Sequence, residues 1–100
     1  MVLYSKHIIL ESEEFDGFLE LEHGKIQGIH KSWEGSYEDY SNCVILPGFI
    51  DIHVHGWATG SFWYEKTEES LRKMCHTLPF SGVTSYLGTT GADSVEEIKR

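Results

Sequence analysis

Residues 47–56 read Pro-Gly-Phe-Ile-Asp-Ile-His-Val-His-Gly, and this stretch decides the fold class. In a β-strand, residues two apart point to the same face, so its polar and aliphatic residues would lie on opposite faces. The polar set is Asp51, His53 and His55, and the aliphatic set is Ile50, Ile52 and Val54. Such a strand suits a parallel α/β barrel, in which helices cover the outer face and the mouth holds polar side chains. We therefore expect a strand from Phe49 to Gly56 with its aliphatic face buried under helices.

The two histidines of this strand are candidate metal ligands. Imidazoles at positions i and i+2 near the carboxyl end of a strand can converge on one cation, since the rigid strand holds them apart at a set distance. The chain has six His in 100 residues, so a pair at this spacing arises easily by chance. The prediction of a metal site therefore depends on the position of the pair, on a strand expected to be buried and directly before Gly56. We predict His53 and His55 as metal ligands, with Asp51 accepting a hydrogen bond from an imidazole.

Before this strand the chain consists of short β-like runs. They span Val2–Leu10, Phe15–Glu22 and Lys25–His30, and the dipeptide His23-Gly24 between the last two suits a tight hairpin. Phe15, Leu19 and Leu21 should form one buried face of the middle run. The polar stretch 32–42 then gives way to an apolar run. We place a domain boundary near residue 43, with a small β domain over 1–43 and an α/β segment over 44–100.

After the histidine strand the pattern changes to helix and then strand. Thr67 is an expected N-cap, and residues 68–78 place Leu71, Met74, Cys75 and Leu78 on one buried helical face. Val83–Leu87 is an expected second strand, Gly88–Ala92 its exit loop, and Ser94-Val95-Glu96-Glu97 a capping box that opens another helix. This β-α-β order builds parallel α/β folds, but two strands do not close a barrel, so we expect the chain to be a fragment.

Composition excludes several classes of function. The formal net charge is −8, with −6 in residues 1–50 and −2 in residues 51–100, and no cluster of Lys or Arg interrupts it. Such a surface repels nucleic acid and anionic membranes. Cys43 and Cys75 stand far apart outside any Cys-x-x-Cys pair, so we expect free thiols. With no leader pattern or long apolar segment, the expected compartment is the cytoplasm.

The pattern Pro-Gly-Phe-Ile-Asp-x-His-x-His-Gly resembles the first-strand signature of the amidohydrolase superfamily. Within it, residues 16–26 and 82–90 are similar to N-acetylglucosamine-6-phosphate deacetylases. Gly88 departs from that family, which often has Pro there. Some members carry amide residues in place of both histidines and keep a single metal, whereas His53 and His55 suit the form that holds two.

This resemblance implies a fold and an activity. The fold would be the start of a metal-dependent (β/α)8 TIM-like barrel preceded by a small β-sandwich domain. The activity would be hydrolysis of N-acetylglucosamine 6-phosphate to glucosamine 6-phosphate and acetate, assisted by one or two divalent ions of Zn or Fe. The full-length protein would be a homodimer acting on an amino-sugar phosphate. The catalytic acid–base and the other ligands would lie beyond Arg100, so the isolated chain should be inactive.

Three further residues could lie near a substrate. Trp57 follows the histidine strand in an aromatic-rich loop, and Thr89 and Thr90 follow the second strand at the mouth end of a barrel. Two alternatives to the deacetylase reading stay open. The chain could belong to another amidohydrolase, of the dihydroorotase or D-aminoacylase type, or it could be a non-catalytic β-rich module with an accidental His pair.

Overall fold

The computed structural model of the chain describes residues 1–57 and 60–99. It divides into two compact units, Met1–Pro47 and Gly48–Arg100. The sequence placed a boundary near residue 43, but Val44–Ile45 forms a short strand, β5, that pairs with the first strand of the chain. Residues 44 and 45 are therefore held in the first unit by backbone hydrogen bonds, which residue pattern alone does not reveal.

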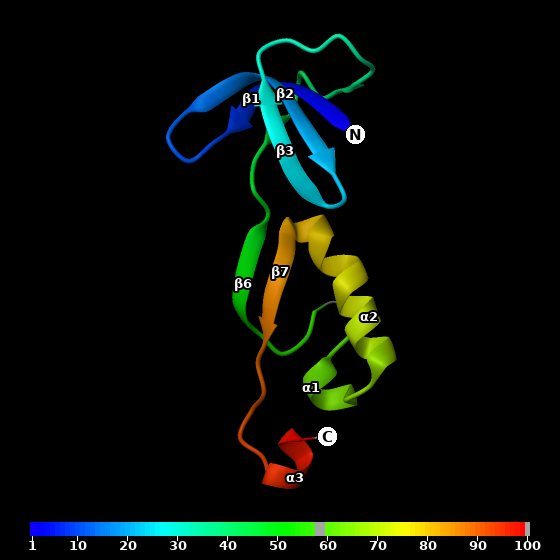
Figure 1. The fold of residues 1–100 in the computed structure, drawn as a ribbon. Helices are drawn as coiled ribbons and strands as arrows, with labels where there is room; N and C mark the ends of the chain where they lie inside the picture. The colour runs from blue at the N-terminus through cyan, green and yellow to red at the C-terminus, as the bar shows by residue number, and fades with distance from the viewer. Residues whose placement is uncertain (58–59, 100) are drawn as a thin grey trace. The chain divides into compact units, whose positions relative to one another are not determined.

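Unit 1 is a small mixed β-sheet, drawn from blue to green in Figure 1. Its strands are β1 (Val2–Ile9), β2 (Glu14–Glu22), β3 (Lys25–His30), β4 (Glu38–Asp39) and β5 (Val44–Ile45). The order is β3-β2-β1-β4, with β5 also on β1; β1–β2 and β2–β3 are antiparallel, whereas β4 and β5 run parallel to β1. The three predicted strands are confirmed, and the predicted hairpin turn has positive φ at His23 (49°) and Gly24 (72°).

The core of unit 1 contains Val2, Ile8 and Leu19. Leu19 is buried, as its predicted strand face requires, while Phe15 and Leu21 on the same face are half-buried. The register of β1 with β2 shifts between Ser5 and Ile8, where the regular ladder is interrupted. At this point the side chain of the fully buried Ser5 makes two hydrogen bonds. Its hydroxyl donates to the Cys43 carbonyl (2.6 Å) and accepts from the His7 N–H (2.9 Å).

Replacing Ser5 by Ala is expected to destabilise unit 1 by about 1–3 kcal/mol, because the Cys43 carbonyl and the His7 N–H lose the buried hydroxyl that joins them. Urea denaturation of the 100-residue chain measures this loss. Ser12→Ala is the control, since Ser12 is exposed, and it should change the free energy of unfolding by less than about 0.5 kcal/mol. Equal stability of both variants would show that the Ser5 hydroxyl is not needed.

Unit 2 is built around a parallel strand pair, β6 (Phe49–Val54) and β7 (Val83–Gly88), with a helix along the chain between them. Figure 1 shows α2 (Glu68–Thr77) alongside β7, followed by the 3-10 turn η1 (Leu78–Ser81). The predicted N-cap is confirmed, because Thr67 Oγ1 accepts from the Ser70 N–H at 3.1 Å. Strand, helix and strand follow in the predicted order.

Two short helices complete unit 2. α1 (Phe62–Glu65) was not expected, because its one turn lies in an aromatic-rich stretch without helical periodicity. α3 (Val95–Ile98) begins where the sequence predicted a helix, with Ser94 Oγ accepting from the Glu97 N–H at 3.3 Å. No helix within residues 1–57 and 60–99 is long and apolar enough to cross a membrane.

The core of unit 2 contains Val54, Met74 and Leu78, with Phe62, Val83 and Tyr86 packed around it. Met74 and Leu78 are buried as predicted, but the prediction was wrong for Leu71, which is 40% exposed, and for Cys75, which is also exposed. The sequence pattern marks a wide apolar face on α2, whereas a sheet of only two strands covers a narrow part of it. Ser70 of α2 is fully buried, although the predicted buried face of this helix contained only apolar residues and Cys75.

The aliphatic face of β6 is also less covered than the sequence predicts. Val54 is buried, but Ile50 is 69% exposed and Ile52 is 73% exposed. The expectation that helices bury all three is therefore wrong for two of them within this chain. α2 packs over the end of β6 at Val54 and over β7, and the register of β6 with β7 shifts on both sides of the segment Ile50–Asp51.

Candidate metal centre

His53 and His55 lie together at the carboxyl end of β6. Their Nε2 atoms are 3.2 Å apart, and their ring centroids are 5.1 Å apart with the planes inclined by 74°. His53 is exposed, and His55 is half-buried. Because both side chains leave the same face of the strand, each ring turns its Nε2 toward the other. The strand thus presents two nitrogen donors to one point, as the i, i+2 spacing predicts.

The separation of these two nitrogens suits a shared cation. Zinc binds imidazole nitrogen at about 2.0–2.1 Å, so two nitrogens on one tetrahedral ion lie about 3.3–3.4 Å apart, close to the 3.2 Å found here. Within residues 1–57 and 60–99, no group of three or more His, Cys, Asp or Glu side chains is arranged to hold a metal. A metal ion held by this pair would need at least one further ligand from outside the described residues.

Asp51 lies on the same strand but acts on the backbone. Its Oδ1 accepts a hydrogen bond from the His53 N–H at 2.9 Å. The sequence predicts that this carboxylate accepts from an imidazole ring, whereas in the structure it accepts from the backbone N–H of His53. Asp51 thus restrains the first histidine through the main chain.

Trp57 lies beside a shallow hollow at the end of the histidine strand. The hollow has a volume of about 320 Å³ and is lined by His55, Gly56, Trp57, Gly60, Ser61 and Tyr64. Trp57 is 45% exposed, and its backbone pairs with that of Gly60 through two hydrogen bonds of 2.7 and 3.0 Å. Ala58 and Thr59, in the loop between them, lie outside the described residues.

The two threonines after β7 occupy different positions. Thr89 is half-buried, and its Oγ1 accepts from the Val54 N–H at 3.1 Å. Thr90 is exposed and lines a second hollow, of about 350 Å³, together with residues of α1, α2 and α3. The structure thus places Thr89 against the histidine strand and Thr90 on a separate surface.

Sequence reasoning missed Ser61. Its hydroxyl donates to the carbonyl of His55 (3.2 Å) and accepts from the Tyr64 N–H (3.3 Å), so it joins α1 to the residue that carries the second imidazole. Ser is a favoured N-cap residue, so Ser61 could have indicated the start of α1. Its contact with His55 was not predictable, because it depends on the path of the loop between residues 55 and 61.

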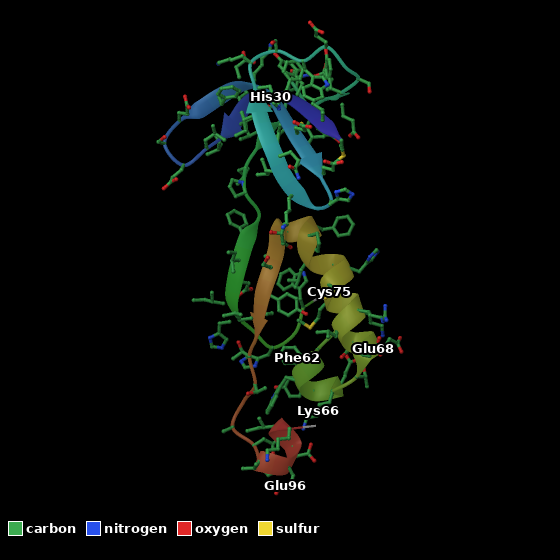
Figure 2. All side chains as sticks on the ribbon, in the orientation of Figure 1. His30, Phe62, Lys66, Glu68, Cys75 and Glu96 are labelled. Atoms are coloured by element: carbon green, nitrogen blue, oxygen red, sulfur yellow. The ribbon has the colours of Figure 1, made fainter. Side chains whose placement is uncertain are left out.

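Cys75 of α2, labelled in Figure 2, contacts Tyr86 of β7. The Cys75 Sγ lies 3.4 Å from the Tyr86 hydroxyl, and both cysteines are free thiols, as predicted. Burial raises the pKa of Tyr86 to about 12, with a further contribution from the hydrogen bond with Cys75. Both effects favour the protonated phenol.

This raised pKa predicts a loss of stability in alkali. An unfolded Tyr86 loses its proton near its ordinary pKa of 10, whereas the folded one keeps it to about 12. The contribution is therefore complete below pH 10 and is lost as the pH rises through 12. Phenolate absorbance of the 100-residue chain should show a component with a midpoint near 12 that Tyr86→Phe removes. A variant that titrates like the parent chain would contradict this assignment.

The sequence was compared with models of protein families and with individual known proteins. No family model matches the chain. Over 91 residues it is 36% identical to the N-acetylglucosamine-6-phosphate deacetylase of Bacillus subtilis strain 168, in a match that covers 83% of this chain and 22% of the relative.

Solved structures agree with this relative. The crystal structure of N-acetyl-D-glucosamine-6-phosphate deacetylase from Mycobacterium smegmatis matches with a TM-score of 0.83 at 19% identity, covering 98% of this chain and 29% of that one. A mutant of the Mycobacterium smegmatis enzyme, in complex with N-acetyl-D-glucosamine-6-phosphate, matches with a TM-score of 0.79 at 18% identity, covering 98% and 26%. The chain spans less than a third of the Bacillus subtilis relative and of each of these two structures. In sequence and in fold, residues 1–100 therefore resemble a part of the N-acetylglucosamine-6-phosphate deacetylases, which are hydrolases.

Proposed function

We propose that residues 1–100 are the N-terminal part of a metal-dependent enzyme that hydrolyses N-acetylglucosamine 6-phosphate to glucosamine 6-phosphate and acetate. The observation that carries this proposal is the pair of imidazole nitrogens 3.2 Å apart at the end of β6, in a chain 36% identical to such a deacetylase over 91 residues. The complete polypeptide that contains these residues is called the whole enzyme below.

The proposal assigns a role to each unit. β6, α2 and β7 would be the first β-α-β unit of a (β/α)8 barrel, and the sheet of unit 1 would belong to a small β-sandwich domain. The exposed Ile50 and Ile52 support this assignment, because an isolated pair of strands leaves an aliphatic face open that later helices of a barrel would cover. The whole enzyme would be a cytoplasmic homodimer.

His53 and His55 would supply two neutral nitrogen ligands to one or two divalent ions of Zn or Fe. Such an ion, when bound, polarises a carbonyl and lowers the pKa of water to near neutrality. Asp51 and Ser61 would hold the backbone of the two histidines through the hydrogen bonds already described. Further ligands, the carboxylate that transfers the proton and the cations that hold the substrate phosphate would come from the rest of the whole enzyme.

The test is acetate release by the whole enzyme. We expect turnover of N-acetylglucosamine 6-phosphate, loss of turnover after removal of metal by a chelator, and recovery on addition of Zn²⁺ or Fe²⁺. Dihydroorotate and an N-acyl-D-amino acid are the comparison substrates, and preference for either would replace the deacetylase assignment with another amidohydrolase. A whole protein that binds no divalent metal and hydrolyses none of the three would overturn the proposal. The isolated chain should release no acetate.

A further inference from the structure

The end of the histidine strand is held differently from its beginning. The parallel register of β6 with β7 shifts between Asp51 and Val54, so the regular ladder is interrupted just before the residue that separates the two histidines. Val54 pairs with Gly88 beyond this shift, and Thr89, the residue after β7, adds its own contacts to Val54. The Val54 N–H donates to Thr89 Oγ1 at 3.1 Å, and the Thr89 N–H donates to the Val54 carbonyl at 2.9 Å.

The Thr89 hydroxyl is engaged in both directions. It accepts from Val54 and lies 3.4 Å from the Leu87 carbonyl, to which it donates. A hydroxyl has one proton to donate, and in this arrangement that proton is directed at the Leu87 carbonyl.

We propose that Thr89 is a positioning residue, which sets the separation of the His53 and His55 rings by holding both polar groups of Val54. This inference rests on the proposed metal role of the two histidines. Val54 is buried and its side chain is packed in the core of unit 2, so its peptide groups are the links through which the two rings are oriented. A rotation of these peptide groups changes the angle between the two side chains.

The Thr89 hydroxyl accepts from the Val54 N–H at the point where Val54 also pairs with Gly88 of β7. Valine matches threonine in shape but lacks this acceptor, so Thr89→Val would remove the side-chain contact and leave the Val54 peptide group less firmly held. Metal ligation tolerates displacements of only about 0.2 Å in ligand distance, so a small rotation matters at the Nε2 atoms. Groups that orient metal ligands typically contribute about 10–100-fold to metal affinity.

The experiment compares Co²⁺ binding by the whole enzyme and three variants, using competition with a chelator and the visible absorption of the bound ion. Thr89→Val is expected to weaken Co²⁺ binding about 10–100-fold and to change the absorption band, because the ligand geometry changes. Thr89→Ser keeps the hydroxyl and should restore both. Thr90→Val is the matched control, since Thr90 is exposed on a separate surface, and it should bind Co²⁺ like the parent protein.

The outcomes separate this proposal from the proposed function. A parent protein that binds no Co²⁺ overturns both. Normal binding by the parent, with unchanged affinity and absorption in Thr89→Val, overturns only the positioning role, even if that variant melts at a lower temperature. If Thr89→Val does not fold, Thr89→Cys offers a weaker acceptor of similar size; it should weaken binding in the same direction, and parent-like affinity in it would overturn the proposal.

Discussion

Replacement of both His53 and His55 by Asn in the whole enzyme is expected to remove one divalent ion per chain and to lower kcat/KM about a hundredfold or more. A hundredfold loss corresponds to about 2.7 kcal/mol of transition-state stabilisation. The physical reason is the pair of Nε2 atoms 3.2 Å apart, a spacing that two ligands of one ion share. Asn is shorter than His and offers a weaker donor, so it would not reach the same point.

Metal analysis of the purified variant measures the first effect, and acetate release measures the second. The matched control is His76→Asn, because His76 is an exposed histidine on α2, away from β6, and its replacement should alter neither quantity. The double variant would contradict the metal assignment if it retained the full metal content of the parent protein. Retention of full activity with one ion lost would restrict the pair to binding a second, non-essential ion.

Met74→Ala is expected to have the largest effect on the folding of unit 2. Met74 is fully buried among Val54, Leu78 and their neighbours, and truncation of such a side chain costs about 2–5 kcal/mol. A domain of this size is stabilised by only about 3–8 kcal/mol in total. Unit 2 of the variant should therefore unfold at a low urea concentration.

Urea denaturation followed by tryptophan fluorescence measures this loss, since Trp57 and Trp63 lie in unit 2. Leu71→Ala is the matched control on the same helix, because Leu71 is 40% exposed and Ala favours helix, so its effect should stay below about 1 kcal/mol. If the two variants lost equal stability, the core of unit 2 would not be centred on Met74.

Much of the local structure was predictable because it depends on nearest neighbours in sequence. The Thr67 and Ser94 caps, the His23-Gly24 turn and the strands of the first hairpin follow from side-chain hydrogen bonds, backbone φ and alternation, all of which act over a few residues. The two-residue strands β4 and β5 were not predictable. Their pairing with β1 depends on the path of a long loop that comes back to this strand. Two residues are also too few to show the alternation that identifies a strand in sequence.

The two histidines of the candidate site were predictable, but most of the residues that hold them in place were not. The i, i+2 spacing places His53 and His55 on one face, because alternation is a property of any strand. The bonds that restrain them involve Ser61, from a loop, and Thr89, from the end of another strand. Ser61 lies 6 positions from its partner His55, and Thr89 lies 35 positions from its partner Val54, so these residues meet only after the chain has folded.

Local residue patterns specify which strand carries the two imidazoles and the order strand, helix, strand around it, because alternation, capping and helical period act over a few residues. The packing of distant segments sets how far apart the two Nε2 atoms lie and which groups hold them there. It also decided that Ile50 and Ile52 stay exposed while Val54 is buried. These properties depend on which elements pack against β6, and a short-range residue pattern contains no information about a neighbour that arrives from a distant part of the chain.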